Sequence, residues 1–143
     1  MNGAIVPYEY HPDIPKLCAG QCPPAEAKPA DRVVFRGIKK LPLGDKDFLS
    51  HVENKTNGYD ASDCEHWGLS VWLTEEAAEH GRRLIRHMRK WHLAKGNIAE
   101  SEGVFLNTPS NNQEEHYTFW KCLDASVTNK FAIALYPLPE EQP

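Results

Sequence analysis

Residues 67–78 read Trp-Gly-Leu-Ser-Val-Trp-Leu-Thr-Glu-Glu-Ala-Ala and contain the change from strand to helix that decides the fold. The first seven residues are mainly aromatic, aliphatic or β-branched, which favours a strand. Thr74 then offers a side-chain oxygen to cap a helix, and Glu75 and Glu76 suit the positive end of the helix dipole. This stretch therefore predicts a strand that leads directly into a helix.

The helix is expected to span residues 75–95. Apolar side chains recur at three- and four-residue steps through Leu84, Met88 and Trp91, which is the period of one helix face. Gly96 stands where a glycine that ends a helix is common. The composition of the remaining segments predicts further strands at residues 32–38, 97–105, 114–123 and 127–138. This order of elements predicts an α+β fold, in which a mixed or mainly antiparallel sheet packs on one long helix.

The length of 143 residues suits a single domain with one core. Residues 1–31 contain six prolines, which disfavour helix and remove backbone donors. We expect these residues to form an extended arm that packs along the domain or along a partner. The folded α+β domain is expected over residues 32–138, and an acidic tail over residues 139–143.

The composition excludes two classes of protein. Hydrophobic residues make up 41% of the chain and aromatic residues 10%, which is too rich for a disordered protein. The apolar runs are far shorter than the roughly 20 residues that span a bilayer. There is also no basic and then apolar leader at the N-terminus, so we expect a cytoplasmic protein with no membrane partner.

Charge is distributed unevenly along the chain. Six Arg and Lys residues and no acid fall within residues 82–95, which we call the basic segment. Because the whole chain carries −4, the residues outside this segment sum to −10. The candidate binding residues of the expected helix are Arg82, Arg83, Arg86, Arg89 and Lys90. Their guanidinium and ammonium groups suit phosphates or an acidic protein surface, and the alternative is a solvated face partly neutralised by upstream glutamates.

The four cysteines leave three alternatives open. Cys18, Cys22, Cys64 and His66 are a candidate set of zinc ligands. However, a Cys-x-His pair has a spacing that chelates a metal poorly. Free thiols and no metal are therefore the expectation. A disulfide between Cys18 and Cys22 is the alternative for an oxidising compartment.

His116 begins a strand-like segment and follows a polar loop. An imidazole in that position can act as an acid, as a base or as a ligand for an anion. A histidine held by hydrogen bonds in a purely structural role is the competing interpretation.

Three short motifs occur in the order Phe35-Arg36-Gly37, Leu69-Ser70-Val71 and Gln113-Glu114-Glu115. This order resembles the Arg-Ser-Glu pattern of ADP-ribosyltransferase-like domains, although the usual second motif of that family is Ser-Thr-Ser. The resemblance implies that Arg36 binds a phosphate of NAD and that Ser70 supports the nicotinamide pocket. It also implies that Glu115 is catalytic, with Gln113 beside it. A second set of motifs comprises Arg36-Gly37, the Gly-Leu-Ser-Val-Trp stretch of residues 68–72 and the His-x-Thr-x-Trp stretch of residues 116–120. This set resembles small bacterial proteins, a likeness that implies no function.

Three functions follow from these features. The first is a binding or assembly protein that contacts a protein or ribonucleoprotein partner through the arm and the basic segment. Its four tryptophans would suit such an interface. The second is an NAD-dependent enzyme of the ADP-ribosyltransferase type, and the third is a nucleic-acid-binding accessory factor. No cofactor is expected except NAD under the second hypothesis.

Overall fold

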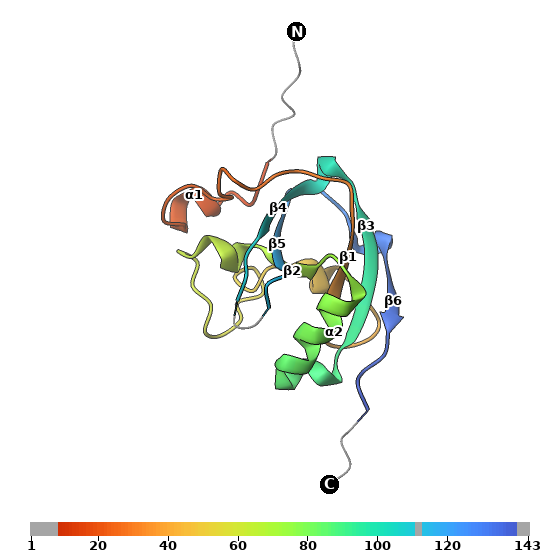
Figure 1. The fold of residues 1–143 in the computed structure, drawn as a ribbon. Helices are drawn as coiled ribbons and strands as arrows, with labels where there is room; N and C mark the ends of the chain where they lie inside the picture. Colours follow the sequence, from red (N-terminus) through yellow and green to blue (C-terminus); the bar gives the residue numbers. More distant parts are fainter. Residues whose placement is uncertain (1–8, 111–112, 140–143) are drawn as a thin grey trace.

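A computed structural model describes residues 9–110 and 113–139 (Figure 1). Its centre is one six-stranded sheet, with strands in the order β4-β5-β2-β1-β3-β6. Every pair of neighbouring strands is antiparallel. The strands are β1 (Arg32–Ile38), β2 (Leu69–Trp72), β3 (His92–Ile98), β4 (Gly103–Asn107), β5 (His116–Lys121) and β6 (Phe131–Leu135). The predicted antiparallel sheet is therefore confirmed, and a sheet accompanied by a few helices is consistent with the predicted α+β class.

The helices are short. In the described residues two are α-helical, α1 (Ile14–Leu17) and α2 (Glu75–Leu84). The 3-10 helices are η1 (Asp45–Phe48), η2 (Cys64–Trp67), η3 (Arg86–Lys90), η4 (Glu100–Glu102) and η5 (Thr128–Lys130). Within the described ranges, no helix is long and apolar enough to cross a membrane.

Helix α2 begins where the sequence predicts. The Thr74 side chain accepts a hydrogen bond from the backbone N–H of Ala77 at 3.1 Å, which caps the first turn. The helix buries Ala77, Ala78 and Gly81 toward the sheet. Because Gly81 has no side chain, the ring of Trp72 can approach the helix closely.

The predicted long helix over residues 75–95 is wrong. Helix α2 ends at Leu84, Ile85 is extended, and η3 supplies one tight turn before β3. β3 pairs with β1 on one side and with β6 on the other, so its backbone donors and acceptors are satisfied by the sheet. Gly96 is a strand residue beneath the ring of Phe131 and ends no helix.

The sheet carries a core on each face. Val34, Ile38 and Val71 belong to one cluster of buried residues. Phe35 and Trp72 belong to a second cluster, which packs against α2. Successive side chains of a strand point to opposite faces, which explains how Val34 and Phe35 enter different clusters.

Residues 9–31 pack against the rest of the fold. Ile14 and Ala27 are buried with Trp67, Val104 and Trp120 in a third cluster, and α1 lies on the β4–β5 side of the sheet (Figure 1). Residues 9–31 therefore pack along the domain, which is one of the two expected alternatives, while α1 and several turns interrupt the predicted extended course. Residues 1–8 of the arm and residues 140–143 of the acidic tail lie outside the described part of the chain.

Candidate functional site

A cavity of about 650 Å³ lies where β1 and β2 separate. Only Phe35 and Trp72 are paired between these two strands in the described sheet, whereas β1 and β3 pair continuously from Arg32–Ile98 to Ile38–His92. We call it the Arg36 cavity. Strand residues of its lining are Arg36 and Gly37 of β1, Ser70 and Trp72 of β2, and His116 of β5. The other lining residues come from residues 39–59 (Lys39, Lys40, Lys46, Asp47, Leu49, His51, Asn54, Thr56, Tyr59), the segment after α2 (Ile85, His87, Met88, Trp91) and the loop before β5 (Ser110, Gln113).

Two hydrogen bonds hold the side chain of Arg36 at the wall of this cavity. Its Nε donates to the backbone carbonyl of Asp47 at 2.7 Å, and its Nη1 donates to that of Ser70 at 2.9 Å. Nη2 makes no hydrogen bond to any described residue, and no ion pair of Arg36 occurs there. Burial lowers the pKa of Arg36 to about 10, and Asp47 opposes that shift. The guanidinium therefore remains charged at neutral pH with a donor available to an anion.

Ser70 and His116 form a hydrogen-bonded pair across β2 and β5. His116 Nε2 lies 3.0 Å from Ser70 Oγ, and His116 Nδ1 lies 2.9 Å from the carbonyl oxygen of Thr108. A proton on Nδ1 donates to that carbonyl and leaves Nε2 as an acceptor for the Ser70 hydroxyl. Burial lowers the pKa of His116, with opposing effects from Thr108 and Glu65. His116 is thus neutral at pH 7 and arranged as a base toward Ser70.

Gln113 lies in the same cavity, beside Trp72. Its Oε1 accepts a hydrogen bond from Trp72 Nε1 at 3.1 Å, and the residue is only 7% exposed. A Cβ added at Gly81 would stand 2.4 Å from Gln113 Oε1. Gly81 of α2 therefore leaves the space in which this amide sits.

The charge of the lining is strongly positive. It includes Arg36, Lys39, Lys40 and Lys46, together with three histidines. Asp47 is the one carboxylate residue among the described lining residues, and its Oδ2 accepts a hydrogen bond from the backbone of Gly44 at 2.9 Å. A cavity with this balance favours an anionic ligand.

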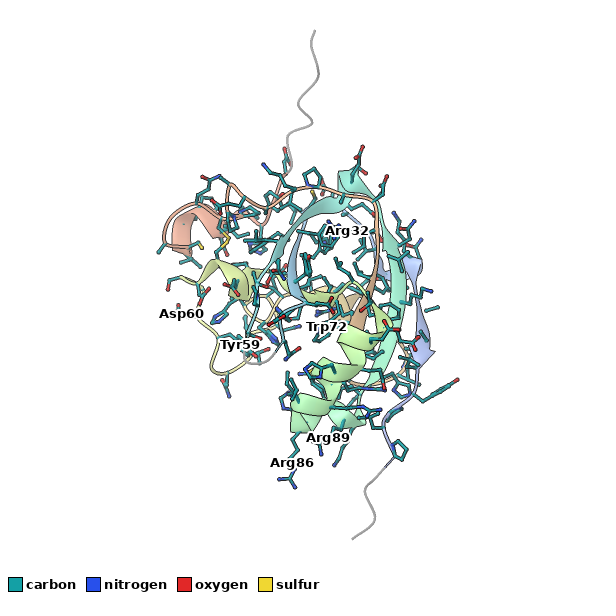
Figure 2. All side chains as sticks on the ribbon, in the orientation of Figure 1. Arg32, Tyr59, Asp60, Trp72, Arg86 and Arg89 are labelled. Carbon is teal, nitrogen blue, oxygen red and sulfur yellow. A yellow bond between two sulfur atoms is a disulfide. The ribbon has the colours of Figure 1, made fainter. Side chains whose placement is uncertain are left out.

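Aromatic rings form another part of the lining. The rings of His51 and Tyr59 are stacked, with centroids 3.8 Å apart and an angle of 11° between their planes. Tyr59 lies in the loop beside Asp60, and Trp72 lies in the sheet (Figure 2). Burial lowers the pKa of His51 to about 4, helped by the charges of Arg36 and Lys39. A neutral stacked pair of this kind suits a planar ligand ring.

Of the site residues expected from the sequence, Arg36, Ser70, Gln113 and His116 all line the Arg36 cavity. Glu115 does not. It is exposed in the turn that precedes β5, and it is absent from the described lining. The described lining therefore does not bring Glu115 together with the other expected residues, because β5 begins one residue later and residues 114–115 are exposed in the turn.

The basic segment has a different geometry from the one expected. Arg82 is 2% exposed, and its Nη1 donates to the carbonyls of Trp91 at 2.8 Å and Tyr136 at 2.7 Å. Arg82 also pairs with Glu79. It is therefore a buried structural residue and no part of an outer binding face. Arg83, Arg86, Arg89 and Lys90 are exposed, and Figure 2 shows Arg86 and Arg89 projecting at the end of α2 and η3.

The cysteines are arranged differently from the expectation of separate thiols. Cys22 and Cys64 form a disulfide, while Cys18 and Cys122 are free. The alternative disulfide between Cys18 and Cys22 is wrong, since Cys22 pairs with a residue 42 positions away. His66 is not part of the cysteine cluster and contacts Asp60 and Asp63 instead.

Sequence reasoning missed the contributions of Lys39, His51 and Tyr59. They come from irregular segments between β1 and β2, where no periodic pattern indicates which side chains face inward. The pair Lys39-Lys40 directly after a strand was the one signal available, and it indicates only local positive charge.

No protein-family model matches the chain, and no curated protein or solved structure is significantly similar to it.

Proposed function

We propose that the Arg36 cavity binds NAD as a substrate and that the protein transfers ADP-ribose from it to a nucleophile. The observation that carries the proposal is the half-buried guanidinium of Arg36, which has no ion-pair partner among the described residues and lies in one cavity with Ser70 and His116. The proposal uses the order of motifs in the sequence, with His116 in place of Glu115 as the reactive group.

The lining supports a dinucleotide in both charge and shape. A pyrophosphate carries negative charge that Arg36, Lys39 and Lys46 can match, and Arg36 Nη2 supplies a direct donor. The stacked rings of His51 and Tyr59 offer a platform for a base. A volume of about 650 Å³ lies within the range of roughly 300–1,000 Å³ usual for small-molecule sites.

The pair of Ser70 and His116 supports the transfer step. The bond between C1′ of the ribose and the nicotinamide nitrogen breaks, and its electron pair leaves with nicotinamide. An acceptor hydroxyl attacks C1′, and its proton passes through the Ser70 hydroxyl to Nε2 of His116. A ribose that gains positive charge is stabilised by a carboxylate, and Asp47 is the carboxylate that the described lining offers.

Thermal unfolding with and without NAD tests the binding step. We expect millimolar NAD to raise the Tm of the wild-type protein by several degrees, because a ligand at about 100 times its Kd adds about 2.7 kcal/mol. Arg36→Ala should abolish this NAD-dependent shift, measured from the Tm of the variant itself. Arg83→Ala is the matched control, since this exposed arginine lies outside the cavity lining. An unchanged wild-type Tm, or a full shift in Arg36→Ala, would contradict the proposal.

A second candidate is the contact with a partner protein, and the surface around η3 supports it. Arg83, Arg86, Arg89 and Lys90 are exposed, while His87 and Met88 of the same element line the Arg36 cavity. An acidic protein held by this surface would lie next to the cavity and would place a nucleophile near it. The binding hypothesis assigns partner contact to the N-terminal arm and to the basic segment. Because residues 9–31 pack against the domain, the exposed basic residues are the better-supported contact surface.

A polyglutamate peptide is a direct probe for that surface. We expect binding that weakens as salt increases from about 50 to 300 mM, because the contacts are exposed charges. The triple variant Arg83→Ala/Arg86→Ala/Lys90→Ala should lose it. Lys16→Ala/Lys28→Ala/Lys55→Ala removes three exposed charges elsewhere and should retain most of it. Salt-independent binding, or equal loss in both triple variants, would reject this candidate.

A further inference from the structure

Three cysteine sulfur atoms lie together at the junction of the N-terminal segment and η2. Cys18 follows α1, Cys22 lies four residues later, and Cys64 begins η2. The Sγ atoms of these residues all lie within 4.8 Å of one another, and each residue is half-buried. Figure 2 shows sulfur in this region, between α1 and the loop that carries Asp60. The lining of the Arg36 cavity includes none of these three cysteines.

We propose that these three cysteines bind one Zn²⁺ ion when the Cys22–Cys64 disulfide is reduced. Thiolates are preferred zinc ligands, and sulfur atoms bound to one tetrahedral zinc at about 2.3 Å stand roughly 3.8 Å apart. Cys18 Sγ already lies within 4.8 Å of the other two sulfur atoms, and reduction of the bond between Cys22 and Cys64 frees these two to move apart to that spacing. Three residues separate Cys18 from Cys22, which is within the range of two to four that is usual for a zinc-binding pair.

The third sulfur is the reason for assigning a metal site as well as a disulfide. A disulfide needs only Cys22 and Cys64, yet Cys18 is held beside them with its Sγ 3.6 Å from the carbonyl oxygen of Ser62. The remaining cysteine, Cys122, is buried elsewhere, with its Sγ 3.8 Å from the carbonyl oxygen of Ser101. The disulfide is thus the oxidised form of a three-cysteine site.

The fourth zinc ligand is a water molecule. His66 is the nearest histidine in sequence, but its Nδ1 accepts a hydrogen bond from the backbone of Asp60 at 2.8 Å. Its Nε2 lies 3.5 Å from a carboxylate oxygen of Asp63. Both ring nitrogens are therefore engaged, and three protein ligands with one solvent ligand complete the tetrahedron.

Loading requires a two-electron reduction. A dithiol reductant breaks the S–S bond, supplies two electrons and two protons, and becomes a cyclic disulfide itself. The protein then carries three thiols, and Zn²⁺ displaces one proton from each as it binds. Oxidation of the thiolates by a disulfide of higher potential reverses the sequence and releases the metal.

Metal content of the full chain tests the site. The protein is reduced with a dithiol, freed of the reductant without oxygen, incubated with Zn²⁺ and desalted. We expect about one zinc per chain by mass spectrometry of the metal. Cys18→Ser should lose stoichiometric zinc although it leaves the disulfide pair intact, whereas the matched variant Cys122→Ser should keep it.

Cobalt gives a second readout that does not depend on any variant. Reduced wild-type protein with Co²⁺ should show thiolate charge-transfer absorption in the near ultraviolet and the intense visible bands of tetrahedral cobalt. Both should be absent after oxidation to the disulfide. The proposal is overturned if folded, reduced wild-type protein holds no zinc, if Cys18→Ser holds as much as wild type, or if the oxidised protein loads equally well.

Discussion

Arg36 lies on β1 between the buried residues Val34 and Ile38, on the strand face that builds one of the cores. A guanidinium there loses hydration, which is the cause of its lowered pKa. Two backbone carbonyls recover part of that loss, and Nη2 is not among the buried atoms that lack a partner, so water reaches it. An anionic ligand in the cavity would replace that water as the acceptor of Nη2.

The lowered pKa of His51 predicts how the stability of the protein depends on pH. Its pKa is lowered from 6.5 to about 4 in the folded protein, mainly by burial. Below pH 6.5 the unfolded chain therefore binds more protons than the folded one, and stability falls between pH 6.5 and about 4. After discounting for solvent exposure, His51 should account for about 1 kcal/mol of that loss.

Urea unfolding at a series of pH values measures this effect. His51→Gln should show a shallower loss of unfolding free energy between pH 6.5 and 4 than the wild-type protein. His80→Gln, which changes an exposed histidine of α2, should follow the wild-type curve. Identical pH profiles for wild type and His51→Gln would show that His51 is not a buried neutral group.

At the scale of elements, the beginning of α2 could be predicted and its end could not. Thr74 and the two following glutamates are local signals, and they act through the first helical turn. Residues 92–98 have apolar side chains at spacings that also fit a helix, but pairing with β1 and β6 decides their conformation. These partners are distant in sequence, so no local pattern reveals them. The site divides in the same way. Arg36, Ser70 and His116 lie on segments that the sequence predicts as strands, whereas His51 and Tyr59 lie in irregular segments.

A substitution at Gly96 tests whether this residue lies in a strand, as in the structure, or ends a helix, as the sequence predicts. A Cβ at this position would stand 2.6 Å from the ring of Phe131, so Gly96→Ala should destabilise the protein by about 1–3 kcal/mol. Gly44→Ala, where nothing lies within 4 Å of the added atom, should cost less than about 0.5 kcal/mol.

A double-mutant cycle with Phe131→Leu identifies the cause. Because a smaller side chain leaves room for the methyl group, Gly96→Ala should cost less in the Phe131→Leu background. Strictly additive free energies of unfolding would mean that the cost arises from the backbone of Gly96, as at a helix end, and not from the ring above it.

At the scale of the whole molecule, positive charge gathers at one place on a protein of net charge −4. The Arg36 cavity contains four Arg and Lys residues, and η3 beside it exposes Arg86, Arg89 and Lys90. The order of charged residues in the sequence predicts the basic segment but not the cavity next to it. Folding is what brings Lys39 and Lys46 into the lining of that cavity. An anionic substrate and an acidic partner would therefore approach the same side of the molecule.

The release of nicotinamide from NAD tests the central claim most directly. Purified wild-type protein, in the presence of an acceptor or of water alone, should release nicotinamide, measured by chromatography. His116→Ala should reduce the rate by about 100-fold or more, because a general base contributes roughly 10²–10⁴. Glu115→Gln should leave the rate within about twofold of wild type, since this exposed side chain lies outside the cavity lining. No release by the wild-type protein, or loss in Glu115→Gln with full activity in His116→Ala, would contradict the account.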